Sequence, residues 1–399
     1  MIYVGTVSGN GSVKGNGKGI YSLSQSDTCL QVVDCLEADS ASVIKASADR
    51  KVIYAANESK NFGGINGSGG GITACRIMDD GRLEKINDSI AYGSRTAYVE
   101  PTSDNRYLLV ANHGSHTTVT CSYERNRNGE WRLKRGFDES NVALFSLRED
   151  GGIGDLLDLV AFEIKGYWCH GGGQSTSHIH CVRTRDDLVF ACNRGADEIE
   201  VLKIDRHANE LVFIYSFFVR SGYAPRYLEF HPHDSIIYVA NENYPSVSVY
   251  RYDAGGKLTE LQMLGTMPEE YYIDRPLPKF EKLHADPEEK NTSGFADRGA
   301  AMPSDIHISQ DGRFLYVSNR GPKGNIAVFR VNQDHTLSPH GHIFIDSKDP
   351  RGFALNGDLL YVGLLDRNTM QVFLLDKESG LVSKHLYDFG LPAPSSFVI

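Results

Sequence analysis

Residues 236–244 read IIYVANENY, a run of β-branched and aromatic residues that ends abruptly in polar ones. Such a run predicts a buried β-strand of about six residues that reaches the surface at one end. Related runs are found at residues 1–6 (MIYVGT), 52–58 (VIYAANE), 107–113 (YLLVANH), 188–194 (LVFACNR), 314–320 (FLYVSNR) and 359–364 (LLYVGL). These copies recur at intervals of about 45 to 80 residues, and the shorter intervals match one propeller blade of four strands.

The surroundings of the copies repeat as well. Most copies follow a short extended segment and a turn rich in Asp, Asn, Gly or Pro, such as residues 231–234 (HPHD), and this arrangement indicates a hairpin. A third apolar run, a second turn and a fourth run then come after most copies, as in residues 246–253 and 258–264. No long window shows helical periodicity, so we predict an all-β fold of seven four-stranded blades.

The two ends of the chain predict how the ring closes. The chain begins at the second-strand pattern, and it ends with residues 394–399 (PSSFVI), which resemble an isolated first strand. We predict that the C-terminal strand pairs with the N-terminal one and completes the seventh blade, because closure removes the exposed edges of an open array. The repeat outweighs the length-based expectation of two or three domains, so residues 1–399 are predicted to form a single seven-bladed β-propeller domain.

Composition argues against several classes of partner. The formal net charge is −10 and no basic stripe is visible, which disfavours nucleic acid. The sequence has no apolar segment long enough to span a bilayer and no signal-peptide pattern at its start, so neither a membrane partner nor secretion is expected. The seven cysteines are scattered, lie mostly in apolar runs and form no CxxC motif. They favour reduced thiols in a cytoplasmic protein and give no indication of a metal or cofactor, while the oligomeric state stays open.

Four long segments depart from the repeat, at residues 57–71, 114–141, 163–177 and 267–303. In a four-stranded blade, the loop that enters the first strand and the loop that joins the second strand to the third lie on the same face. All four segments fall in these two loop classes. Loops longer than about 15 residues are usually functional or disordered, so we predict a walled or lidded pocket over the central channel.

Polar residues at the strand ends fall on the same face. They are His178, His180, Arg226, Asp305 and Arg351 at the starts of first strands, Glu58, His113, Arg194, Glu242 and Arg320 at the ends of second strands, and Gln174 in a long loop. In a closed ring these side chains converge on the axis, where so many charges are costly to bury without a ligand or one another. The set therefore predicts a small-molecule site, although each residue alone could form a blade-to-blade salt bridge or a solvated rim.

Several of these residues lie in segments that carry a family resemblance. The segments are residues 3–6 (YVGT), 177–180 (SHIH), 224–226 (APR) running to 230–232 (FHP), 238–242 (YVANE) and 311–321 (DGRFLYVSNRG), the last being the most specific. Through them essentially the whole chain resembles the seven-bladed propeller lactonase family. That family includes the bacterial 6-phosphogluconolactonases of propeller type and the fungal carboxy-cis,cis-muconate cyclases. The proposed site of the cyclase branch, with one His, two Arg and one Glu, implies His180, Arg226, Arg320 and Glu242.

The chain also departs from the family pattern. It has His113 where the lactonases usually have an aromatic residue, and Asn193-Arg194-Gly195 where they often have Asp-Leu-Gly. The loops at 114–141 and 267–303 are longer than usual. These changes are expected to line the pocket, so the usual substrate of the family does not carry over directly.

The resemblance and the converging side chains favour a hydrolase acting on a sugar lactone, such as a phosphorylated or otherwise acidic aldonolactone. Arg226 and Arg320 would stabilise the oxyanion or bind a substrate anion, and His180 would be the general base. Glu242 could orient His180 or be the base itself. The remaining candidates are expected to bind substrate. No GxSxG context is present, so an acyl-enzyme is not expected.

Three other functions remain open. A cycloisomerase or lyase could use the same His, Glu and Arg residues to open or close a lactone ring without water. A propeller can also be a non-catalytic binding module, because fold does not fix function. A metal-dependent lactonase with Glu58, Glu242 and Asp305 as ligands is disfavoured, because no acidic cluster at ligand spacing is evident.

Overall fold

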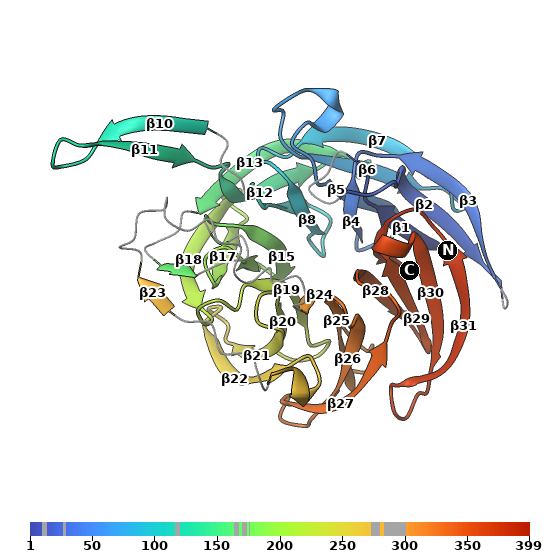
Figure 1. Cartoon of the computed structure of the whole chain (residues 1–399). Coiled ribbons are helices and arrows are strands. Elements are labelled where there is room, and N and C mark those ends of the chain that lie inside the picture. The colour runs from blue at the N-terminus through green and yellow to red at the C-terminus, as the bar shows by residue number, and fades with distance from the viewer. Residues whose placement is uncertain are drawn as a thin grey trace.

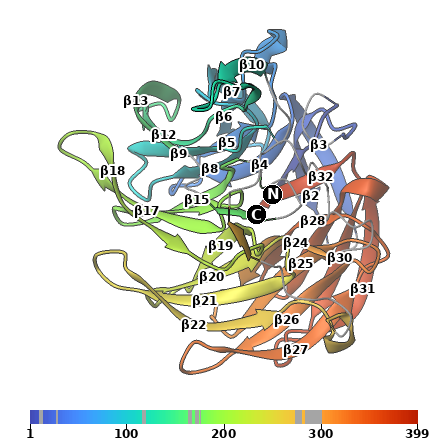
Figure 2. The same cartoon turned by 60° about the vertical axis from the view of Figure 1, so that its left-hand side comes forward.

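The chain forms a ring of seven antiparallel sheets with four strands each (Figures 1 and 2). The computed structural model describes residues 1–9, 14–26, 29–115, 120–162, 167–169, 174, 176–272, 280–282 and 301–399. We number the sheets as blades and name their strands from the ring axis outward. Blade 1 contains β4 (Ala41–Ala46), β5 (Val52–Asn57), β6 (Gly71–Ile77) and β7 (Leu83–Ile90); blade 2 contains β8 (Thr96–Pro101), β9 (Tyr107–Asn112), β12 (Ser140–Leu147) and β13 (Ile153–Phe162); blade 3 contains β15 (Ile179–Arg185), β16 (Leu188–Asn193), β17 (Glu198–Asp205) and β18 (Glu210–Phe218); blade 4 contains β19 (Pro225–Phe230), β20 (Ile236–Asn241), β21 (Ser246–Tyr252) and β22 (Leu258–Gly265); blade 5 contains β24 (Met302–Ile308), β25 (Phe314–Arg320), β26 (Asn325–Val331) and β27 (Leu337–Phe344); blade 6 contains β28 (Pro350–Asn356), β29 (Leu359–Leu364), β30 (Thr369–Leu375) and β31 (Val382–Gly390); blade 7 contains β32 (Pro394–Val398), β1 (Ile2–Thr6), β2 (Gly19–Gln25) and β3 (Leu30–Glu37).

The predicted closure is confirmed. The C-terminal strand β32 pairs with β1 in antiparallel register, with Tyr3 opposite Val398 and Gly5 opposite Ser396. The two termini lie side by side in both views of the ring (Figures 1 and 2). Blade 7 is therefore assembled from both ends of the chain, and its second strand, β1, is paired on both sides.

The seven repeated runs are the second strands of the seven blades, as predicted. Every residue of β5, β9 and β20 is buried, because neighbouring strands flank each one and adjacent blades cover both faces of its sheet. This double burial explains why the runs are continuously apolar rather than alternating.

A tyrosine clamp repeats between neighbouring blades. The Tyr54 hydroxyl donates to the Gly151 carbonyl of the next blade (2.9 Å), and Tyr316 does the same to Gly380 (2.8 Å). Each acceptor lies in the outer hairpin, between the third and fourth strands of its blade. The phenol rings fill the space between sheets, while their hydroxyl groups fix how one blade sits against the next.

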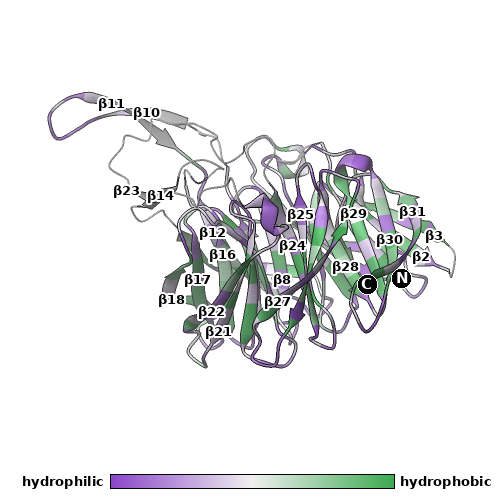
Figure 3. Ribbon diagram, turned by 60° about the horizontal axis from the view of Figure 1, so that its bottom comes forward, coloured by the Kyte–Doolittle hydropathy of each residue, from purple (hydrophilic) through white to green (hydrophobic). Residues whose placement is uncertain are grey.

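The long loops contain regular structure. Where the sequence indicates one long loop over residues 114–141, β10 (Thr120–Arg125) pairs with β11 (Trp131–Gly136) in a hairpin that stands out from the ring (Figures 1 and 3). Asn126 makes the turn, because its side-chain oxygen accepts the N–H groups of Asn128 and Glu130. The hairpin extends away from the ring body instead of walling the channel.

Two other long loops meet each other. The segment β14 (Tyr167–Cys169) from the loop before blade 3 pairs with β23 (Phe280–Lys282) from the loop before blade 5. Most of the predicted lid, at 163–166, 170–173, 175, 273–279 and 283–300, lies outside the described residues. Short 3-10 turns are found at Phe62–Gly64, Glu269–Tyr271 and Leu365–Arg367. In the described ranges, no helix has the length and apolar character needed to cross a membrane.

Deleting residues 394–399 should lower the melting temperature by roughly 10 °C or more, because blade 7 would lose its innermost strand. Differential scanning calorimetry can measure this loss. Removing the projecting β10–β11 hairpin is the matched control, since it deletes a strand pair that belongs to no blade and should shift the transition by only a few degrees. An unchanged transition after the C-terminal deletion would contradict a ring held by this pairing.

Candidate active site

A buried asparagine ends most of the second strands and fixes the rim of the ring. Asn112 donates to the Ala91 carbonyl (2.7 Å) and accepts from the Thr96 hydroxyl (2.8 Å). Asn319 makes the same two contacts with the carbonyl and hydroxyl of Thr266 (3.0 and 2.7 Å). Each asparagine thus ties down the loop that enters its own blade. The next residue in the chain, such as His113 or Arg320, is thereby held at the mouth of the channel.

Glu242 follows such an asparagine and is the centre of a charge cluster. Its Oε2 lies 2.5 Å from Arg194 Nε and 3.5 Å from Arg226 Nε, and its Oε1 lies 2.7 Å from Arg320 Nη2. Burial alone would raise the pKa of Glu242, but the three guanidinium groups outweigh burial and hold this pKa well below its usual range. Glu242 is therefore ionised, and arginines engage both of its oxygens.

The cluster spans three consecutive blades. Arg194 comes from blade 3, Glu242 and Arg226 from blade 4, and Arg320 from blade 5. The Arg226 guanidinium lies over the Tyr227 ring, 4.3 Å from its centroid, and donates to the Ser304 carbonyl of blade 5. Because these contacts cross two blade interfaces, the cluster fixes the relative positions of its own side chains.

His180 lies beside this cluster on the innermost strand of blade 3. Its ring meets Tyr227 and His113 edge-on, with centroids 5.4 and 5.1 Å apart. Burial, and next the charge of Arg226, lower the pKa of His180 well below 6.5, so the imidazole is neutral. Its Nδ1 is buried and has no hydrogen-bond partner among the described residues. A neutral, unpartnered imidazole nitrogen of this kind can accept a proton from a bound molecule.

A small cavity lies on the ring axis next to His180. Its walls come from the innermost strands of all seven blades and from Glu58: Ser42, Val43, Ala97, His180, Arg226, Tyr227, Ser304, Arg351 and Ser395. The free volume is about 10 Å³, room for about one water molecule. Since every blade contributes, closure of the ring is what forms this cavity.

The structure brings most of the predicted residues together at this end of the channel. Glu58 and Arg351 line the cavity with His180 and Arg226. The rings of His113 and His178 stack with centroids 4.4 Å apart, next to His180.

Gln174 lies one step away from the cavity. Its buried amide donates to the Arg194 carbonyl (2.9 Å) and to Asp197 (2.8 Å), a residue that the sequence did not single out. Asp197 also accepts the N–H groups of Gly222 and Ala224, and burial raises its pKa to about 6. Gln174 and Asp197 together position the backbone at Arg194 and at the start of the strand that carries Arg226.

Asp305 belongs to a second set of charges outside the lining of the cavity. Its Oδ2 accepts the Phe353 N–H (3.1 Å) and lies 3.2 Å from His307 Nε2, whose Nδ1 is 3.4 Å from Glu229. Arg183 continues the series, because it contacts Glu229 at 3.3 Å and Glu100 at 2.8 Å. Glu242 is engaged by arginines, and Asp305 is engaged by His307 and the Phe353 N–H group. The candidate metal ligands Glu58, Glu242 and Asp305 therefore do not form a carboxylate cage.

The second set was not anticipated, although the sequence carries its signal. Charged residues stand at the same register of the innermost strand in five blades, opposite the third residue of the second strand: Lys45, Glu100, Arg183, Glu229 and His307. A charge recurring at one position of short inner strands would have located this layer.

The sequence and the fold are similar to those of known proteins. The family model described as "Lactonase, 7-bladed beta-propeller" matches residues 1–399. The chain belongs to this lactonase family. It is 27% identical to a 6-phosphogluconolactonase of Formosa agariphila, covering 86% of this chain and 84% of the relative, and 23% identical to a 6-phosphogluconolactonase of Bacillus subtilis, covering 98% and 96%. The solved structure of the periplasmic gluconolactonase of Pseudomonas aeruginosa has a TM-score of 0.77 at 22% identity, with coverage of 100% and 98%, which shows the shared fold.

In this member of the lactonase family, the Glu242→Gln substitution should lower the free energy of unfolding by about 3–5 kcal/mol, because three buried guanidinium groups would lose their counter-charge. Urea unfolding at pH 7 measures the change. Glu84→Gln breaks the exposed pair with Arg76 and serves as the control, with an expected change within about 0.5 kcal/mol. Equal effects of the two substitutions would show that the buried cluster does not stabilise the fold.

The pH dependence of stability should report on His307. Burial alone would lower the pKa of His307, but Asp305 and Glu229 outweigh burial and raise it to about 9. Because this pKa is raised in the folded state, its stabilisation is full below pH 6.5 and is lost as the pH rises through about 9. Relative to the His307→Gln variant, the wild type should lose on the order of 2–3 kcal/mol of unfolding free energy between pH 6.5 and 9. A difference that stays constant over this range would contradict the ion pairs of His307.

Proposed function

We propose that the protein hydrolyses a sugar lactone that carries an anionic group, by attack of a water molecule that His180 deprotonates. The observation that carries this proposal is His180, whose buried Nδ1 has no partner among the described residues, in the lining of a water-sized cavity beside Arg226. The family membership and the names of the relatives, 6-phosphogluconolactonases, support a lactone as the substrate class.

Glu242 is the weaker candidate for the base. A carboxylate whose two oxygens contact three guanidinium groups, and whose pKa lies well below its usual range, has little tendency to take a proton. We assign Glu242 the task of holding Arg226 and Arg320 in place. His180, in contrast, is neutral and lines the cavity that one water molecule would fill.

Arg226 is the best candidate for stabilising the oxyanion. Its Nε forms no hydrogen bond within the described part of the chain, and it lies 3.5 Å from Glu242 Oε2 as an ion pair. A fixed guanidinium donor stabilises the negative charge that develops when water attacks a carbonyl carbon. Arg320 would share this role from the other side of Glu242.

The remaining charges favour an acidic substrate. Arg351 also lines the cavity, and its ion pair with Asp349 is 4.0 Å long, near the limit for such a contact. Arg194 adds a further guanidinium where the family often has leucine. We infer that Arg351 and the rim residues His113, His178 and Glu58 bind the phosphate or carboxylate and the hydroxyl groups of the sugar ring at the mouth of the cavity.

A sugar lactone as the substrate would assign the protein to carbohydrate metabolism. A cytoplasmic location is part of it and is supported by free thiols at Cys29, Cys35, Cys75, Cys181 and Cys192.

The test is a pH-stat assay on 6-phosphogluconolactone and gluconolactone, followed by product analysis in ¹⁸O-labelled water. Hydrolysis incorporates one solvent oxygen into the product, whereas a cycloisomerase or lyase incorporates none. His180→Gln should lower kcat/KM by about 10²–10⁴-fold, and Arg226→Lys should lower kcat by about 10²–10³-fold. The exposed histidine variant His385→Gln is the control and should retain full activity.

The pH profile adds a second readout. Only the unprotonated base is active, and the pKa of His180 lies well below 6.5, so kcat/KM should stay constant as the pH falls from 8 to 6.5. A loss of activity centred at pH 6.5 or above, or near-full activity in both site variants, would refute the assignment.

A further inference from the structure

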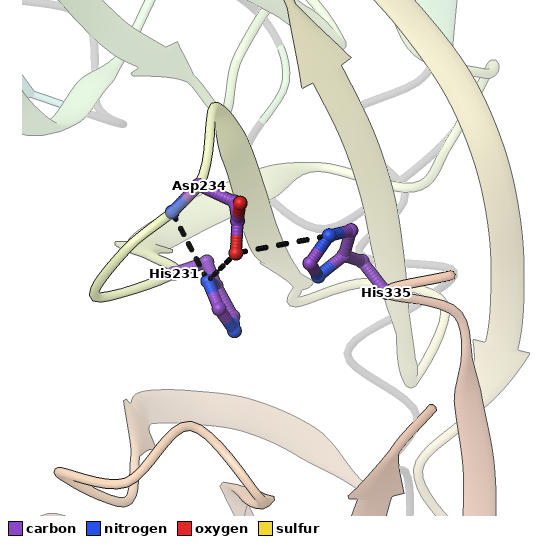
Figure 4. Close-up of side chains that lie close together, drawn as sticks. All are labelled: His231, Asp234 and His335. Carbon is purple, nitrogen blue, oxygen red and sulfur yellow. Dashed lines mark hydrogen bonds and ion pairs between the residues drawn. The ribbon is translucent and has the colours of Figure 1, made fainter. Parts of the chain in front are cut away.

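Three side chains with metal-binding atoms meet on the face of the ring opposite the candidate active site. His231 and Asp234 lie in the turn between β19 and β20 of blade 4, and His335 lies in the outer hairpin of blade 5 (Figure 4). The nearest ligand atoms, one from each residue, all lie within 4.8 Å of one another. Asp234 Oδ2 is 3.0 Å from His231 Nδ1 and 3.7 Å from His335 Nε2.

The contact between His231 and Asp234 can accommodate a cation. His231 Nδ1 accepts the backbone N–H groups of Asp234 (3.2 Å) and His233 (3.4 Å), so this nitrogen presents a lone pair. The Nδ1 atom of His231 and the Oδ2 atom of Asp234 lie 3.0 Å apart, a separation that a shared cation can bridge.

The turn that carries His231 departs from the pattern of other blades. In three of them the corresponding position is Ser47, Thr102 or Ser309, whose hydroxyl group donates to an aspartate two residues later. Blade 4 has His231 instead, and its aspartate is three residues later. The substitution replaces a hydroxyl group by an imidazole and brings the carboxylate toward blade 5.

The position of His335 departs from the repeat as well. The same four-residue turn, with one hydrogen bond from its fourth residue back to its first, occurs at residues 78–81, 126–129, 148–151 and 253–256. There the fourth residue is Gly81, Gly129, Gly151 or Gly256, each with a positive φ. In blade 5 this residue is His335, with φ +69°. A residue with a Cβ in the left-handed region costs backbone energy, and at this position it brings the His335 ring to Asp234.

We propose that His231, Asp234 and His335 bind a divalent transition cation of the Zn²⁺ type between blades 4 and 5. Two imidazoles and one carboxylate are ligands that Zn²⁺ prefers, and water completes the coordination. A tetrahedral site with bonds of about 2.1 Å has ligand–ligand edges of about 3.4 Å, and the observed 3.0 and 3.7 Å lie on either side of this value. Asp234 and His335 are partly open to solvent, which gives the cation a path of entry.

The backbone around the site is already held in place. Arg185 of blade 3 donates to the carbonyls of both His231 and Asp234 (2.8 and 3.0 Å), and the Tyr238 hydroxyl lies 3.4 Å from the His335 carbonyl. The ligand-bearing turns therefore need no large rearrangement to bind. The ligands come from turns of different blades, so they form no local spacing motif in the sequence. For this reason the sequence indicated no metal. A bound cation would act as a clamp between blades, apart from the lactone site.

The experiment is isothermal titration of the chelator-treated full-length protein with ZnCl₂, paired with thermal unfolding. The wild type should bind one equivalent of Zn²⁺, and its melting temperature should rise by about 2–4 °C at a Zn²⁺ concentration about 100-fold above Kd. MgCl₂ should produce neither effect, because imidazoles are poor ligands for this ion.

His335→Gly is the decisive variant, because it installs the residue that other blades carry at this position. It should lose the Zn²⁺ equivalent and the thermal shift, and without metal it should unfold at the same or a slightly higher temperature, since glycine accepts the positive φ. Asp234→Asn, which keeps the size of the side chain, should weaken binding at least tenfold.

The matched control is His385→Gln, which removes a histidine paired with a single aspartate, Asp388. This variant should bind Zn²⁺ as the wild type does. The proposal is overturned if the wild type shows no saturable Zn²⁺ binding. It is overturned equally if His335→Gly retains the equivalent, since the cation then lies elsewhere, for instance at the histidines of the lactone site. Lactonase activity of His335→Gly should be unchanged, so failure here is distinguishable from failure of the proposed function.

Discussion

The pairing of β32 with β1 is the constraint on which the rest of the structure depends. β32 also contacts the neighbouring blade on its other side, because Ser395 donates to the carbonyls of Gly5 in blade 7 and Ser42 in blade 1. The innermost strands approach so closely that a Cβ on Gly352 would lie 2.0 Å from the Ser395 carbonyl. Closure thus brings the starts of the seven innermost strands together around one axis. Residues distant in sequence, such as His180 and Ser395, line one cavity only because of it.

The charges along the axis form two layers that differ in their balance. In the layer containing His307, acidic and basic groups alternate from Glu100 through Arg183 and Glu229 to Asp305, and each has a partner of opposite sign. Such a network satisfies itself and needs no ligand. Among the described residues at the cavity end, four arginines (Arg194, Arg226, Arg320 and Arg351) face three carboxylates (Glu58, Glu242 and Asp349). This difference between the two layers is one basis for the proposal of an anionic substrate.

The repeat made the fold predictable from sequence. The second strands, their asparagines and the isolated C-terminal strand define the blades, and strand direction alone assigns His180, Arg226, Glu242 and Arg320 to one mouth of the channel. What could not be predicted is how side chains pair within that mouth. The sequence leaves open whether His180 or Glu242 is the base, and only the three contacts to Glu242 separate them. Gln174 has the same difficulty, because a polar residue in a loop can face the cavity or, as here, the backbone of Arg194.

In a repeat protein, the positions where one copy breaks the common pattern carry more information than the common pattern itself. Glycine adopts the left-handed conformation of an outer turn without strain, whereas a histidine in this conformation costs backbone energy that a side-chain contact can offset. Leucine in place of Arg194 would only fill space, whereas arginine adds a third guanidinium group that pairs with Glu242, next to Arg226 and Arg320. Both departures are visible in the sequence, but their meaning depends on what the next blade presents to them. The register between blades, which no single repeat encodes, therefore decides whether such a departure becomes a site.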